Sequence, residues 1–292
     1  MYPNHGAGSA CGKKMSKETT DTLGNQKKTN YALRADMTED EFVNELLNGL
    51  TAPPGYFPKN VVMNMKGYES LDVVLKRAKR PLNATEFEIT ANITGALILD
   101  VRNPDVFAQG FIPNSINIGL NGNYATWVGE MVKDINQKIL LVTEPGQEEE
   151  AMIRLSRVGY DHTIGYLDGG YATWVTSNKP FETIVRITAL DFENYYNQGI
   201  PVIDVRKTSE FNAEHVVGVN SVPLNSIYEN LSIFPKDKKF ILYCAGGYRS
   251  MIAASILKQL GYDGFADVTG GYTEIAKTNV PRTEYICPVS LL

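Results

Sequence analysis

The sequence has little of what several classes of protein need. Only three of its 292 residues are cysteines and only three are histidines. Three cysteines cannot form the framework of a disulfide-stapled secreted domain, so a reducing compartment such as the cytoplasm is expected. No apolar stretch approaches the roughly 20 residues that cross a bilayer, and the first residues lack the apolar core of a signal peptide. The sequence therefore predicts a protein that neither spans a membrane nor carries a disulfide framework.

Excess positive charge is also missing. The chain has 28 lysines and arginines against 33 aspartates and glutamates, which gives a formal net charge of −5. This balance argues against a nucleic-acid surface. Hydrophobic residues make up 43% of the chain and charged residues 21%, which is typical of a globular protein. A chain of this length exceeds the usual span of one domain, so two domains and an appendage are expected.

One of the three cysteines, Cys244, stands in an informative place. It follows the apolar run 240–243 and opens a loop of sequence CAGGYR, after which residues 250–260 have a helical pattern that Gly261 ends. This order predicts a thiol at the carboxyl end of a strand and the amino end of a helix, where the helix dipole and free N–H groups stabilise an anion. The thiolate is the nucleophilic form of cysteine. We therefore predict that Cys244 is a catalytic nucleophile rather than a structural cysteine.

The rest of the loop is suited to hold the reacting group. Two glycines permit backbone angles that let successive N–H groups converge on the sulfur, and an arginine adds a fixed positive charge where the loop joins the helix. The predicted substrate-binding residues are Ala245, Gly246, Gly247, Tyr248 and Arg249.

A charged pair, Asp204 and Arg206, follows the apolar run that begins at residue 202. The carboxyl ends of parallel strands meet at one edge of a sheet, so this pair could support the loop. A structural ion pair at the strand end is the simpler interpretation.

The loop resembles the active-site loop of rhodaneses, Cys-x-x-Gly-x-Arg, which Cys244, Gly247 and Arg249 match. The resemblance extends through residues 203–206, 210–211, 220–224 and 268–272. It implies a sulfurtransferase that moves sulfane sulfur from thiosulfate or a low-molecular-weight persulfide to a thiol or cyanide. A persulfide on Cys244 would be the intermediate, with no cofactor and no metal. The oligomeric state is left open.

The chain repeats itself once. Residues 99–102 align with 203–206, and residues 168–171 align with 269–272. A period of about a hundred residues is the size of a domain. The near-continuous apolar runs at 97–101, 139–143, 202–205 and 240–243 are typical of strands covered on both faces. The sequence thus predicts an α/β fold with two tandem rhodanese-like domains, 83–180 and 181–292, each a parallel sheet with helices on both faces.

The first copy has lost the reactive cysteine. Thr143 stands where Cys244 stands in the second copy, and Pro145, which has no N–H, follows in the loop. Acidic residues at 144 and 148–150 would oppose a bound anion. We predict that this domain is inactive and architectural.

Residues 1–82 form a leading segment of a different kind. Its start, Tyr2-Pro3-Asn4-His5-Gly6, resembles a late metal-ligand segment of metallo-β-lactamase-fold proteins of the persulfide dioxygenase type that are fused to rhodaneses. His5 matches the ligand. A metal site needs three or more partners, and the chain lacks the histidine cluster of that fold. We expect an incomplete remnant that holds no metal.

Two other functions stay open. Cysteine-based phosphatases and arsenate reductases also use a cysteine-plus-arginine loop. Four residues separate Cys244 from Arg249, whereas the related phosphatases use five, and a tetrahedral phosphate needs the wider cradle. A non-catalytic sulfur carrier or binding module is the second alternative, because the first domain shows that the site can be lost.

Overall fold

The computed structural model describes residue 2, residues 19–47 and residues 55–286 of the chain. His5, Cys11 and Cys287 lie outside the described residues. The chain divides into two compact units, Met1–Ala52 and Pro53–Leu292.

The described part of the first unit contains only short helical elements. They are α1 (Leu23–Thr29), the 3-10 helix η1 (Tyr31–Leu33) and α2 (Glu39–Leu47). A capping box precedes α2, since Thr38 N–H donates to Glu41 Oε2 and Glu41 N–H donates to Thr38 Oγ1. No residue of these three elements is buried.

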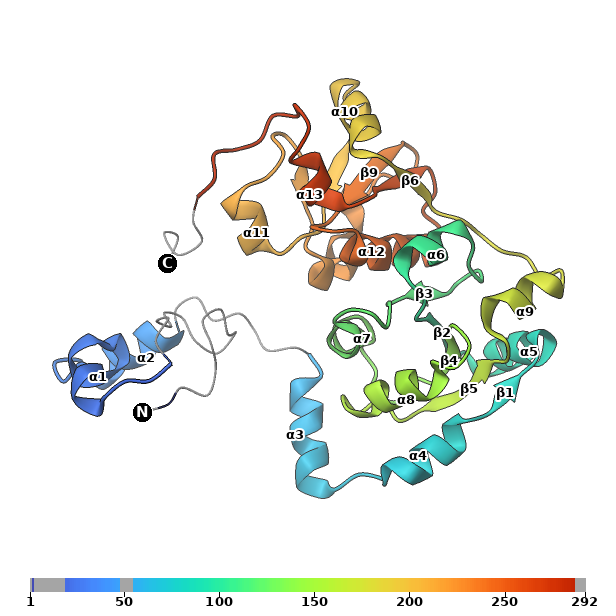
Figure 1. Ribbon diagram of the computed structural model, residues 1–292, viewed down its shortest axis with the longest axis horizontal. Coiled ribbons are helices and arrows are strands. Elements are labelled where there is room, and N and C mark those ends of the chain that lie inside the picture. Colours follow the sequence, from blue (N-terminus) through green and yellow to red (C-terminus); the bar gives the residue numbers. More distant parts are fainter. Residues whose placement is uncertain (1, 3–18, 48–54, 287–292) are drawn as a thin grey trace. The chain divides into compact units, whose positions relative to one another are not determined.

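The second unit is built on two parallel sheets of five strands each (Figure 1). The strand order is β1-β5-β4-β2-β3 in the first sheet and β6-β10-β9-β7-β8 in the second. The order is the same when the strands of each sheet are numbered from one, which confirms the predicted repeat. The strands of the first sheet are β1 (Pro81–Leu82), β2 (Leu97–Asp100), β3 (Ile116–Asn117), β4 (Ile139–Val142) and β5 (Thr163–Leu167). Those of the second are β6 (Val185–Ile187), β7 (Val202–Asp204), β8 (Asn220–Ser221), β9 (Phe240–Tyr243) and β10 (Phe265–Val268).

Helices connect the strands of both sheets. The first domain and the segment before it contain α3 (Phe57–Lys66), α4 (Leu71–Ala78), α5 (Ala84–Thr94), α6 (Pro104–Gln109), α7 (Tyr124–Met131), α8 (Glu148–Ser156) and α9 (Gly170–Thr176). The second contains α10 (Ala189–Asn197), α11 (Thr208–Ala213), η2 (Leu224–Ser226), η3 (Tyr228–Ile233), α12 (Tyr248–Gln259) and α13 (Gly271–Ile275).

Both faces of each sheet are covered. In β4 all four residues are apolar and buried. Side chains of a strand alternate between faces, so Ile139 and Leu141 join one hydrophobic cluster and Leu140 and Val142 join another. The predicted α/β fold with helices on both sides of each sheet is thereby confirmed.

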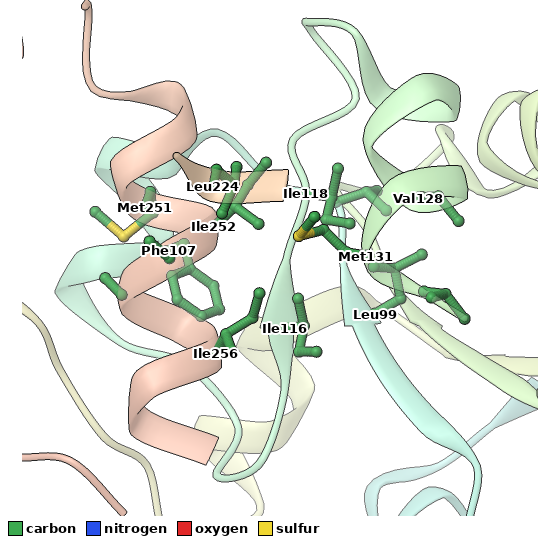
Figure 2. Close-up of a cluster of buried hydrophobic side chains, with 14 of the residues drawn as sticks. Leu99, Phe107, Ile116, Ile118, Val128, Met131, Leu224, Met251, Ile252 and Ile256 are labelled. Atoms are coloured by element: carbon green, nitrogen blue, oxygen red, sulfur yellow. The ribbon is translucent and has the colours of Figure 1, made fainter. Parts of the chain in front are cut away.

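The two sheet domains share one core. Helix α12 of the second domain packs against β3 and α6 of the first, and Figure 2 shows its residues Ile252 and Ile256 facing Ile116 and Phe107. A buried hydrogen bond, 3.0 Å from Asn117 N to Ser255 Oγ, crosses the same contact. The helix that follows Cys244 is therefore packed against the other domain along its length.

Residues just before position 83 also belong to the first sheet domain. Strand β1 pairs in parallel with β5, and α4 packs against α8 and β5. This pairing could not be predicted from the sequence, because a two-residue strand carries no detectable periodicity.

No helix among the described residues has both the length and the apolar character needed to cross a membrane.

Candidate active site

Cys244 follows β9 directly and lies beneath the start of α12. The helix begins at Tyr248, two residues earlier than the sequence pattern predicted, because Gly247 takes the N-cap position with φ of +98°. A side chain is strained at such a φ, and glycine is not. Cys244 is 1% exposed, whereas Gly246 is exposed and has open space around it. The loop is thus exposed at Gly246, while the thiol itself is buried.

The backbone of the loop turns toward the sulfur. Gly247 N–H donates to Cys244 Sγ at 3.1 Å. The N–H groups in the first turn of α12 have no partner within the helix, so the helix presents its positive end to the same region. The Cys244 sulfur thus lies where backbone N–H donors and the positive end of a helix converge.

Arg249 does not stand free beside the loop. Its guanidinium forms two bonds to the carboxylate of Glu210, at 2.5 Å and 2.8 Å. The hydrogen bonds that Arg249 donates to this carboxylate raise the pKa of Arg249. Burial acts to raise the pKa of the Glu210 carboxyl, but the bonds and charge of Arg249 hold it below its ordinary value. The pair is thus ionised at neutral pH and fixes the guanidinium in one place.

Sequence reasoning missed Glu210 as part of the site, although the internal repeat carries a signal for it. In the first domain Val106 aligns with Glu210, and Glu148 aligns with Arg249. The domain that lacks the cysteine has thus also lost both members of the ion pair. Comparing the two copies position by position would have marked Glu210.

The Asp204–Arg206 pair is buried, and its two side chains are bonded to each other. Arg206 contacts the Asp204 carboxylate at 2.7 Å, donates to Glu214 O at 2.9 Å, and lies over the Tyr272 ring at 3.8 Å. The first domain has the same cluster without a cysteine, with Arg102 bonded to Asp100 and Gly110 O and stacked on Tyr171 at 4.1 Å. This repetition supports the structural interpretation of both pairs.

A glycine turn after β10 contacts the loop from the other side. Tyr272 N–H donates to Cys244 O at 2.7 Å and Thr273 N–H donates to Ala245 O at 3.1 Å. The turn comes this close only because Gly271 has no side chain, since a Cβ there would lie 2.3 Å from Cys244 O.

The Tyr248 side chain points away from the loop. Its hydroxyl donates to Gly119 O of the first domain at 2.7 Å, and its ring lies against Gly119 and Gly122. Only the backbone of Tyr248 can therefore contact a reactant that is bound in the loop. The predicted loop residues 244–249 lie together, but this side chain is occupied elsewhere.

A buried carboxyl lies behind the loop. Asp267 of β10 is fully buried and accepts a bond from Arg186 Nε at 3.0 Å, while Arg186 also pairs with Asp105 of the first domain. Burial raises the pKa of Asp267 to about 7, against the opposing charge of Arg186 and a contact with Ser250.

The raised pKa of Asp267 predicts a pH-dependent contribution to stability. Between about pH 4 and about pH 7 the folded chain retains a proton that the unfolded chain loses. The free energy of unfolding should therefore fall as pH rises through this window, by at most roughly 1.4 kcal/mol per pH unit from this group. Asp267→Asn should flatten that fall, as measured by urea unfolding at several pH values. An unchanged slope in the variant would contradict the assignment.

The corresponding place in the first domain holds a threonine instead of a cysteine. Thr143 is 1% exposed and its hydroxyl has no partner among the described residues. The acidic residues 148–150 lie in the first turn of α8, where they offset its dipole. No group of three or more histidine, cysteine, aspartate or glutamate residues in the described part of the chain could hold a metal ion.

A cavity of about 380 Å³ lies in the second domain, at the end of the sheet opposite to the Cys244 loop. It is lined by the first residues of β6, β9 and β10, including Val185, Phe240 and Phe265. Cys244 follows the opposite end of β9, so the cavity is not part of the candidate site.

Known proteins match both sheet domains. The model of the rhodanese-like domain matches residues 83–177 and 188–278. Thiosulfate sulfurtransferase PspE of Escherichia coli is 34% identical over 80 residues, which cover 27% of this chain and 76% of that protein. Adenylyltransferase and sulfurtransferase uba4 of Ogataea parapolymorpha is 27% identical over 115 residues, 38% of this chain and 29% of that protein. The chain thus spans well under half of the length of that relative.

A solved structure is also similar. The rhodanese-related protein of Thermoplasma volcanium has 29% sequence identity and a TM-score of 0.32, over 34% of this chain and 97% of that one.

Proposed function

This chain belongs to the rhodanese-like domain family, and on that premise we propose that it is a sulfurtransferase in which Cys244 carries the sulfur. The observation on which the proposal rests is the 3.1 Å bond from Gly247 N–H to Cys244 Sγ at the junction of β9 and α12. In its thiolate form Cys244 would be held by the loop and would act as the nucleophile. Ala245, Gly246 and Tyr248 would contribute backbone N–H groups to the same sulfur.

The reaction would proceed by two displacements. The Cys244 thiolate attacks the sulfane sulfur of thiosulfate or of a small persulfide. The sulfur–sulfur bond of the donor breaks, and sulfite or a thiolate leaves with the electron pair. An acceptor thiolate or cyanide then attacks the outer sulfur of the Cys244 persulfide. The thiolate of Cys244 is released, so the two steps balance without a cofactor.

The charges around the loop support sulfur rather than phosphate transfer. Arg249 is already bonded twice to Glu210, so its charge is paired with a carboxylate before a phosphate could bind. Four residues between Cys244 and Arg249 make a tight loop. The remaining alternative is a sulfur carrier without turnover. Such a carrier would undergo the first displacement but would not release its sulfur to a small acceptor in the second.

Turnover with labelled thiosulfate tests the proposed function. Thiosulfate labelled in its outer sulfur should yield labelled thiocyanate when cyanide is added. One label per chain without turnover would favour the carrier. Absence of label, together with hydrolysis of p-nitrophenyl phosphate, would favour a phosphatase.

Restoring the cysteine alone should not revive the first domain. We expect Thr143→Cys to take up no second sulfur, because Pro145 offers no N–H and Glu148 stands in place of Arg249. The number of sulfur atoms per chain after thiosulfate treatment, read by intact-mass spectrometry, checks this. Two sulfur atoms per chain would show that the acidic loop does not prevent the reaction.

The leading segment is proposed to be a remnant of a metallo-β-lactamase-like domain, on the resemblance at residues 2–6. With His5 as its single matched ligand, the purified chain should hold no stoichiometric iron or zinc. Elemental analysis tests this, and one metal per chain that is lost in His5→Ala would overturn it.

The scarcity of cysteine supports a reducing compartment such as the cytoplasm.

A further inference from the structure

Tyr248 joins the candidate site to the first domain. It is the first residue of α12 and follows Gly247, whose N–H contacts the Cys244 sulfur. Its hydroxyl is bonded to Gly119 O at 2.7 Å. Burial raises the pKa of the Tyr248 phenol, so the hydroxyl stays protonated and donates this bond at physiological pH.

The segment of the first domain that receives Tyr248 is itself fixed. Arg154 of α8 donates to Leu120 O at 2.6 Å and to Gly122 O at 3.1 Å. Its guanidinium also lies 5.4 Å from the centre of the Tyr124 ring and 3.4 Å from Glu150. The helix that carries Arg154 follows the loop that has lost its cysteine.

Two glycines make room for the tyrosine ring. A Cβ on Gly122 would lie 2.5 Å from Tyr248 Cε2, and a Cβ on Gly119 would lie 3.3 Å from the same atom. Neither glycine has a positive φ. At Gly122 the three nearest atoms all belong to the Tyr248 ring, whereas at Gly119 the Arg102 carbonyl oxygen and Pro104 Cδ also lie 3.3 Å away. At Gly122 the ring is therefore what excludes a side chain.

These contacts form a continuous path from the inactive domain to the sulfur. We propose that Arg154, Gly119 and Gly122 of the first domain position Tyr248, and that Tyr248 in turn places the Gly247 N–H at the Cys244 sulfur. The first domain is then a positioning element for the site of the second. This inference rests on the proposed function for its kinetic consequence, but the placement of the loop can be measured without it.

Gly122→Ala is the sharpest test. The added methyl group should displace the Tyr248 ring and slow the uptake of sulfur from thiosulfate in a single turnover by about tenfold, since misplacement of a reacting group by a fraction of an ångström has effects of this order. Deuterium exchange at the amides of residues 245–250 should become faster in the same variant. That second measurement needs no sulfur chemistry, so it reports on the loop even if the chain proves not to transfer sulfur.

A matched control separates positioning from loss of stability. Gly129 also faces a tyrosine ring in the first domain, and a Cβ there would lie 2.1 Å from Tyr56 Cδ1. Gly129→Ala should lower the free energy of unfolding while it leaves sulfur uptake and exchange at residues 245–250 unchanged. Equal losses of uptake in both alanine variants would overturn the proposal.

A double-mutant cycle gives the decisive readout. In a Tyr248→Ala background the methyl group at position 122 has no ring to displace, so Gly122→Ala should have no additional effect on uptake or exchange. Arg154→Gln should show the same dependence on Tyr248, with a smaller effect. Additive effects of Gly122→Ala and Tyr248→Ala would contradict the path through the tyrosine, whereas wild-type protein that takes up no sulfur would contradict only the proposed function.

Discussion

Cys244→Ser is expected to abolish sulfur transfer to cyanide while the fold is retained. A serine hydroxyl at its ordinary pKa is a poor nucleophile, and it cannot form a persulfide. The loss should be at least about a thousandfold, in the range found when other nucleophilic residues are removed. Steady-state formation of thiocyanate measures the loss, and the thermal unfolding midpoint shows whether the fold is intact.

The other two cysteines supply the controls for this variant. Cys11→Ser and Cys287→Ser should keep full activity, since every group of the candidate site lies between residues 204 and 273. If Cys244→Ser retained most of the activity while one of these variants lost it, the sulfur would be carried elsewhere and the assignment of the site would be wrong.

Gly271→Ala should have the second-largest effect. Its Cβ would lie 2.3 Å from Cys244 O, and its φ of +55° disfavours alanine. Because the clashing atom is backbone, the loop cannot yield by rotating a side chain. We expect sulfur transfer to fall at least about tenfold, together with a lower unfolding midpoint.

The repeat supplies a matched control for this glycine. Gly170 has a φ of +64°, and a Cβ there would lie 2.5 Å from Thr143 O in the first domain. Gly170→Ala should lose similar stability but keep sulfur transfer when both variants are assayed well below their unfolding midpoints. A comparable loss of transfer in Gly170→Ala would mean that the fall reflects stability rather than the position of the Cys244 loop.

Much of the fold could be predicted from local patterns. Strands such as β4 and β9 are near-continuous apolar runs, and the glycine after Cys244 marks the turn into α12. The repeated Leu/Ile-Asp-Val-Arg segment indicated two similar domains, because its Asp–Arg pair is needed in each core. These features depend on residues close together in the chain.

The contacts that complete the candidate site could not be read in the same way. Glu210 and Arg249 are 39 residues apart, and Tyr248 and Gly119 are 129 apart. Tyr248 looked like a loop residue suited to bind a reactant, and only the packing of α12 against β3 turns its side chain toward the other domain. Which side chains meet across an interface depends on packing, for which a local pattern holds no signal.

The central claim is that Cys244 carries a sulfur atom between donor and acceptor. Mass spectrometry of the chain after treatment with thiosulfate tests it most directly, with peptide mapping to locate any added mass. We expect one added sulfur atom per chain, on Cys244, which cyanide removes. An unmodified Cys244, or a sulfur atom on Cys11 or Cys287 instead, would contradict it.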